Sequence, residues 1–118
     1  MADLLPNVEQ ARIDARKLRD SALNPEHPSG RYKAEFFRQM GYTAEDWQEL
    51  ERDIREQHLS QVAQPGKSSP HGSKYVITAP LRGPLGSPRQ VTTVWLIRHG
   101  NDFAELVTKE PASRRKES

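Results

Sequence analysis

The sequence predicts an α+β domain in which N-terminal helices pack on one face of a small antiparallel β-sheet, a three- to four-stranded meander. Apolar residues recur at helical spacing as far as about residue 58 and alternate with polar ones from residue 74, and a stretch rich in Pro, Gly and Ser separates the two patterns. A chain of 118 residues supplies one modest core. We therefore expect one compact domain over residues 1–110 and a disordered basic tail over residues 111–118.

The first two helices are expected before residue 42. Asp14 is placed to cap the first helix, which runs to about residue 23 and ends before Asn24-Pro25. The second helix is expected from about Gly30 to Gly41. Gly41 suits a left-handed terminator, because glycine adopts that conformation without steric cost.

The third helix begins at a capping-box spacing, with Thr43 and Asp46 as partners, and continues to about His58. Its apolar residues form one inward stripe, Trp47, Leu50 and Ile54. The segment that follows, QPGKSSPHGS (64–73), has no periodicity. We expect it to be a mobile connection.

Three strands are expected after this connection. KYVITAPL (74–81) alternates, with one buried face formed by Tyr75, Ile77, Ala79 and Leu81, and Pro80 restricts it to an edge or a strand end. RQVTTVWLIR (89–98) is apolar on both faces, as a central strand is. HGND forms a turn and FAELVT (103–108) the last strand.

Composition argues against several classes of protein. Without Cys there is neither a disulfide framework nor a thiolate metal site, so a cytoplasmic location is the default. The N-terminus lacks a secretory pattern, and no run approaches the roughly 18 apolar residues of a membrane span. The four His have no metal-ligand spacing and no nucleotide-binding loop is present, so we expect neither a metal nor a cofactor, and no membrane partner.

Charge is distributed unevenly along the chain. Residues 57–101 contain Lys and Arg but neither Asp nor Glu. Such a segment suits an anion, and we take its ordered cations as candidate nucleic-acid-binding residues. These are Lys74, Arg82, Arg89, Arg98 and His99. A polar loop followed by two strands with few charges explains the same pattern equally well.

Lys33 occupies a position in the second helix where an apolar residue would be expected. At about 100° per residue it falls between Phe37 and Met40, on the side that faces the core. One explanation is snorkelling, in which the methylene stem covers the aromatic rings and the ammonium reaches water. The other is that Lys33 reaches a cleft between helix and sheet and binds an anion there.

Three further residues complete the candidate catalytic set. His27 and Arg31 lie at the N-terminal end of the same helix, where free N–H groups and the helix dipole attract phosphate. Arg31 stands where an acid would be more stable, which favours a function, whereas an isolated His27 is more often a surface or turn residue. Thr93 is both a common strand residue and a possible phosphate ligand. The set is His27, Arg31, Lys33 and Thr93.

The stretches NPEHPSGRYKAEFF (24–37) and TVWLI (93–97) resemble a bacterial family known only as a domain of unknown function, over about residues 5–108. Members occur free-standing and as the C-terminal module of polymorphic toxins. They are similar to compact metal-independent ribonucleases of the barnase, EndoU, colicin and RelE type. The resemblance singles out His27, Gly30, Lys33, Tyr75, Thr93 and Trp95. This chain ends its last strand in TKEP and a charged tail, where the family often has an aromatic-bearing strand.

Two functions are expected from these observations. The first is an RNA-binding and RNA-cleaving domain, in which a ribose 2′-OH attacks the adjacent phosphate without a metal. His27 would act as general base or acid, Arg31 and Lys33 would stabilise the developing charge, and Thr93 would bind a phosphate oxygen. The second is a non-catalytic protein-binding adaptor or toxin-neutralising module. The expected ligands are RNA, a cognate inhibitor or another partner protein.

Overall fold

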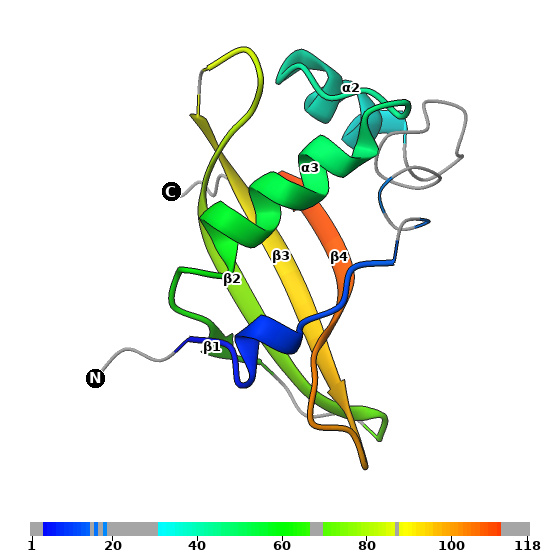
Figure 1. The fold of residues 1–118 in the computed structure, drawn as a ribbon, viewed down its shortest axis with the longest axis vertical. Coiled ribbons are helices and arrows are strands. Elements are labelled where there is room, and N and C mark those ends of the chain that lie inside the picture. The colour runs from blue at the N-terminus through cyan, green and yellow to red at the C-terminus, as the bar shows by residue number, and fades with distance from the viewer. Residues whose placement is uncertain are drawn as a thin grey trace.

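The computed structural model describes residues 4–14, 16, 18, 31–66, 70–86 and 88–111, of which 31–33, 110 and 111 by their backbone only. The elements follow the order η1 (Val8–Gln10), α2 (Arg31–Gln39), α3 (Trp47–Asp53), η3 (Ile54–His58), β1 (Gln64–Pro65), β2 (Gly72–Arg82), β3 (Pro88–Arg98) and β4 (Glu105–Pro111). The strands form one twisted sheet, α3 lies across it, and α2 lies at one end (Figure 1). The predicted α+β class is confirmed.

The sheet is antiparallel, with its four strands in the order β1-β2-β3-β4. β2 and β3 pair along their whole length. β1 pairs with β2 through Gln64 and Pro65. The expectation of a mobile connection over residues 64–73 is therefore wrong at residues 64–65 and at residues 72–73, which are the start of β2, and residues 67–69 lie outside the described residues. β4 begins at Glu105, two residues later than expected, and a register shift between Val94 and Trp95 marks a bulge in its pairing with β3.

The alternation predicted for β2 is confirmed by burial. Ile77, Ala79 and Leu81 are buried, whereas Thr78 and Pro80 are exposed. β3 is the central strand, as its two apolar faces predict, and it buries Val91, Thr93 and Trp95 on the same side. Burying an aliphatic or aromatic side chain stabilises the fold by roughly 1.5–3 kcal/mol, so this face of the sheet holds the core.

The helices do not act together as an N-terminal layer on the sheet, and this part of the predicted architecture is wrong. Among the described helices, α3 and η3 together form one continuous helix across the face, and they bury Leu50 and Ile54 fully (Figure 1). α2 stays beside the β2–β3 hairpin, because Gly41 turns the chain at φ 103° directly after this helix. The Met40 carbonyl then accepts a hydrogen bond from Leu85 N–H at 3.2 Å. The glycine terminator itself is confirmed.

The third helix begins later and ends differently than expected. Thr43 and Asp46 do exchange hydrogen bonds, from Asp46 N–H to Thr43 Oγ1 at 3.3 Å and between the side chains at 3.4 Å. These bonds form a turn, and helical geometry starts at Trp47. Its last turn, η3, is a π-helix in which Leu59 N–H donates to Ile54 O at 3.1 Å.

A buried hydrogen bond joins the end of α2 to α3. Tyr42 Oη donates to Asp53 Oδ2 at 2.6 Å, and both residues are buried. Burial and this bond to a carboxylate raise the pKa of Tyr42.

Among the described residues no helix is both long and apolar enough for a bilayer span.

Asp14 behaves as the predicted cap. Its Oδ1 accepts a hydrogen bond from the Arg16 backbone N–H at 2.9 Å, which is the N-cap interaction with the second residue of a helix. Most of the helix expected after Asp14 lies outside the described residues. The same holds for residues 112–118 of the expected tail.

Candidate nucleic-acid interface

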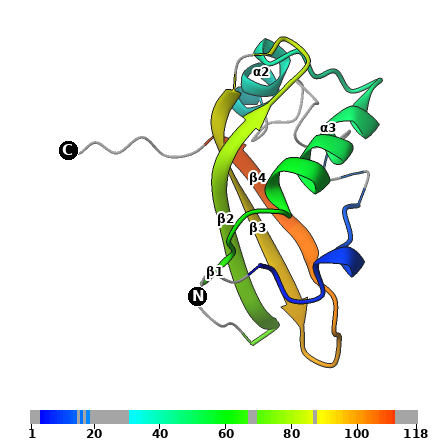
Figure 2. The same cartoon turned by 60° about the vertical axis from the view of Figure 1, so that its left-hand side comes forward.

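The sheet has a covered face, which holds the core, and an open face on the other side. No described helix lies over the open face (Figure 2). Its central residues are cross-strand neighbours in β2, β3 and β4, namely Val76, Thr78, Thr92, Val94 and Thr108. The hydroxyls of Thr78 and Thr92 form a hydrogen bond at 3.0 Å. These five central residues are uncharged, and Glu110 of β4 is the cross-strand partner of Thr92.

Lys74 and Arg82 mark the two ends of this surface. Both have the strand parity of Val76 and Thr78, so they lie on the open face. They are separated by about 26 Å along β2, at roughly 3.3 Å per residue. Both are exposed, and neither forms an ion pair with a described residue. Their charges are thus available to a ligand.

Arg98 and His99 lie near the Lys74 end. The pairing of Gly72 with Arg98, next to that of Lys74 with Leu96, brings Arg98 to the same end of the sheet. Arg98 Nε lies 3.3 Å from Glu105 Oε2, so part of its charge is neutralised. His99 is exposed in the turn after β3. Lys74 forms no ion pair with a described residue, so of these three residues it is the cation most available to a ligand.

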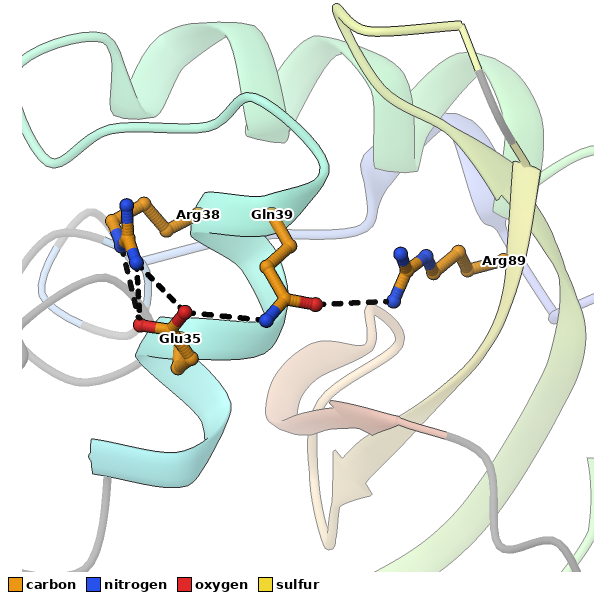
Figure 3. A network of polar contacts seen from close by, with 4 residues as sticks. All are labelled: Glu35, Arg38, Gln39 and Arg89. Carbon is orange, nitrogen blue, oxygen red and sulfur yellow. Dashed lines mark hydrogen bonds and ion pairs between the residues drawn. The ribbon is translucent and has the colours of Figure 1, made fainter.

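Arg89 is directed elsewhere, toward α2 (Figure 3). Its Nη1 donates to Gln39 Oε1 at 3.4 Å, and its guanidinium lies 5.7 Å from the centre of the Phe36 ring. Gln39 in turn donates to Glu35 Oε2 at 3.2 Å. Arg38 donates to Glu35 at 2.7 Å and thereby lowers the pKa of that carboxyl. Arg89 therefore belongs to the contact between β3 and α2, not to the open face.

Of the four candidate catalytic residues, only Thr93 has a described side chain. His27 lies outside the described residues, and Arg31 and Lys33 are placed by backbone alone in the first turn of α2. Thr93 is fully buried on the covered face. It therefore lies on the opposite side of the sheet from Lys74 and Arg82.

Thr93 belongs to a closed polar network with His58 and Trp95. His58 Nε2 lies 3.2 Å from the carbonyl oxygen of Ala79, which can only accept, so this nitrogen carries the proton. His58 Nδ1 then accepts from Thr93 Oγ1 at 3.0 Å, and Thr93 Oγ1 accepts from Trp95 Nε1–H at 2.9 Å. All three side chains are fully buried. Every polar side-chain group of the three residues thus has a hydrogen-bond partner, and one lone pair of the Thr93 hydroxyl accepts no bond from the network.

The buried role of His58 was not predicted. A signal existed, because His58 follows Ile54 at i+4 and so continues the apolar stripe of the third helix. At 0% exposure it is the residue that joins η3 to both β2 and β3. From the sequence, His58 was expected only at the end of the third helix.

Burial lowers the pKa of His58 from its ordinary 6.5, because the imidazolium would lose its hydration there. The unfolded chain therefore binds this proton more tightly than the folded chain. As far as His58 is concerned, we expect the free energy of unfolding to be constant between about pH 7.5 and 9 and to fall as the pH decreases below about 6.5. Urea unfolding at a series of pH values measures this. A profile that stays flat below about pH 6.5 would contradict the expectation.

A cavity of about 340 Å³ opens where β1 meets the open face. It is lined by Gln61, Val62, Gln64, Val76 and Thr78. The side chains of Gln64 and Val76 share the open face, because these two residues are direct cross-strand partners. The cavity was not predicted, since the segment before β1 was expected to have no fixed position.

These features define a small α+β domain with a four-stranded antiparallel meander, one covered face and one open face with cations at its ends. The chain belongs to the family described as Domain of unknown function (DUF6883), which it matches over residues 4–113. No curated protein and no solved structure matches it. The expected membership of a family of unknown function is confirmed, whereas the association with toxins and the similarity to ribonucleases stay predictions. Within the described part of the chain, no three His, Asp or Glu residues are grouped as metal ligands would be.

Proposed function

We propose that this domain binds single-stranded RNA on its open face and cleaves it without a metal, as a toxin-type endoribonuclease. The observation that carries the proposal is that Lys74 and Arg82 are exposed at the two ends of the open face and form no ion pair with a described residue. Glu45, Asp46 and Glu56 are exposed on the helical side. A phosphate backbone is attracted to the two cations and repelled by the three acids.

The valine and threonine residues between these two cations suit single-stranded RNA more than a rigid duplex. Two cations about 26 Å apart along one strand can hold phosphates at the two ends of a short extended segment. Between them, the hydroxyls of Thr78, Thr92 and Thr108 offer donors and acceptors to the ribose 2′-OH groups. The 2′-OH is the group by which proteins distinguish RNA from DNA.

Cleavage is assigned to the N-terminal end of α2. His27 accepts the proton of a ribose 2′-OH while this oxygen attacks the adjacent phosphorus. The bond from phosphorus to the 5′-oxygen breaks, that oxygen takes up a proton from solvent, and a cyclic phosphate remains. Arg31 and Lys33 stabilise the charge of the pentavalent intermediate. We assign Thr93 no contact with RNA, because its hydroxyl is buried on the covered face and bonds His58 and Trp95.

Binding to the open face predicts that Lys74→Gln weakens the affinity for single-stranded RNA about three- to tenfold and reduces the slope of log affinity against log salt by about 1. Arg52→Gln is the matched control, since it removes the same charge from the exposed helical side. The control should bind like the wild type. Fluorescence titrations at several salt concentrations measure both quantities, and equal losses in the two variants would remove the open face as the binding site.

Cleavage predicts that purified protein degrades labelled RNA in EDTA and that Lys33→Ala abolishes this activity. Arg38→Ala is the control on the same helix, because Arg38 is exposed and pairs with Glu35. Its activity should be unchanged. Intact RNA with the wild-type protein under all conditions would exclude an endoribonuclease and leave RNA binding to be judged by the titrations.

The second candidate is a non-catalytic adaptor or toxin-neutralising module. The exposed acids Glu45, Asp46 and Glu56 on the helical side favour it, because they suit a basic partner protein. In that case Lys33→Met is tolerated or stabilising, and expression of the wild-type chain does not slow bacterial growth. An active ribonuclease would slow growth, and Lys33→Ala would relieve the effect.

A further inference from the structure

We infer that the cavity beside β1 is a subsite for one unpaired nucleobase. This inference rests on the proposed binding of RNA and adds a place where the base itself is recognised. The cavity has about 340 Å³, near the lower end of the roughly 300–1,000 Å³ that ligand pockets span. It lies on the same face as the proposed path of the RNA backbone.

The cavity forms because the chain leaves β2 just before β1. Gln64 pairs with Val76, but the pairing does not continue upstream to residue 62. Leu59 and Ala63 are buried in the core and hold the chain toward the covered face. The resulting space is bounded by the departing chain on one side and by β2 on the other, so its shape depends on core packing.

The lining is neutral and offers hydrogen bonds of both kinds. Gln61 and Gln64 carry amides with two donors and one acceptor oxygen each, and neither amide bonds another described residue. Val62 is 43% exposed and forms an apolar wall with Val76. None of the described lining residues is charged, so a charged ligand finds no counter-ion among them. A neutral planar ring with donors and acceptors along one edge fits it, and unstacked bases are read in this way by amide side chains.

The nearest cation fits the phosphate of the same nucleotide. Lys74 lies two residues before Val76 on the same face of β2, about 7 Å away along the strand. Lys74 is exposed, and its long side chain can reach a phosphate at the mouth of the cavity. A base in the cavity and a phosphate at Lys74 would therefore fix the register of the RNA on the sheet.

An added peptide strand is a poorer occupant. Gln57 already occupies the edge of β2 at Arg82, where its Oε1 accepts from the backbone N–H at 2.7 Å and its Nε2 donates to the carbonyl at 3.0 Å. Pro80 has no N–H to donate. Thr78 is the only residue left between β1 and Gln57 that offers both backbone groups on this edge, which is too little for strand addition.

Titration with the four ribonucleosides tests the subsite apart from the proposed function, because nucleosides carry no phosphate. We expect at least one of them to cause saturable NMR shifts of the Gln61 and Gln64 side-chain amides and of the Val62 and Val76 methyls. The double variant Gln61→Leu/Gln64→Leu should lose at least tenfold in affinity for that nucleoside. Gln90→Leu is the control, since Gln90 is exposed on β3 outside the cavity.

Absent or unsaturable shifts with all four nucleosides would overturn the subsite, and so would equal losses in the double variant and in Gln90→Leu. RNA supplies the complementary measurement. Octamers of a single base should bind the wild type with different affinities and bind the double variant with equal affinities and an unchanged salt slope. Equal affinities for all four octamers with the wild type would remove the subsite and leave the proposed RNA binding standing. Saturable nucleoside binding without RNA binding would support the cavity and overturn the proposed function.

Discussion

Thr93→Val is expected to lower the free energy of unfolding by about 2–4 kcal/mol, although valine has nearly the shape of threonine. The Thr93 hydroxyl donates to His58 Nδ1 at 3.0 Å and accepts from Trp95 Nε1–H at 2.9 Å. Valine would leave both partners buried without a hydrogen bond, and each unsatisfied buried group costs about 1–3 kcal/mol. Urea unfolding above about pH 7.5, where the unfolded imidazole is neutral as well, measures the effect.

Thr92→Val is the matched control for this substitution. Thr92 is the next residue of β3, points to the open face, is only half-buried, and bonds Thr78, which is exposed. Its loss should cost less than about 0.5 kcal/mol, because water replaces the hydrogen bond. Equal small losses at both positions would contradict the closed network. If Thr93→Val abolished cleavage at unchanged stability, Thr93 would take part in the reaction and not only in the stability of the fold.

The sequence predicts the sheet well because its pattern is long and regular. The alternation from Tyr75 to Leu81 extends over the part of β2 that is buried on one side, and the two apolar faces of β3 identify the central strand. Pro80 predicts an edge, and it lies in the part of β2 that has no partner on the β1 side. The alternation of apolar and polar residues along a strand and the missing N–H of proline are local properties. The sequence alone therefore shows them, without knowledge of the tertiary structure.

Features set by tertiary contacts escaped prediction. β1 has two residues, Gln64 and Pro65, and too short a strand has no period to detect. The π-helical turn η3 depends on Ile54 and His58 being fixed together against the sheet. The position of α2 depends on contacts with residues distant in sequence, among them the backbone bond from Leu85 to Met40 and the contact of Arg89 with Phe36. None of these contacts leaves a local pattern in the chain.

The sequence indicated candidate cations for the interface but not where each of them lies on the sheet. Lys74 and Arg82 lie on the open face, as their parity opposite Ile77 requires. The parity of Arg89 with the buried Val91 could have placed it on the covered side, where it meets α2. The amide-lined cavity had no signal, because it exists only where the chain diverges from β2.

Gly83→Ala is expected to lower the free energy of unfolding by about 2–3 kcal/mol and to displace α2. A Cβ at Gly83 would lie 2.6 Å from the Met40 carbonyl oxygen and 3.0 Å from the Tyr42 ring. The carbonyl cannot move away freely, because it accepts a hydrogen bond from Leu85 N–H. Overpacking of this kind costs typically about 1–3 kcal/mol, and here it acts on a backbone atom. Urea unfolding gives the loss.

Gly86→Ala is the control in the same hairpin, because a Cβ there meets nothing within 4 Å. Gly86 has φ +90°, so alanine incurs only local backbone strain, about 1–2 kcal/mol. The two variants also separate the stability of the fold from the position of α2, which carries Lys33. Under the proposed function, Gly83→Ala should reduce RNA cleavage below the level of Gly86→Ala even where both proteins are fully folded. Equal cleavage by the two folded variants would show that the docking of α2 against the hairpin has no part in the reaction.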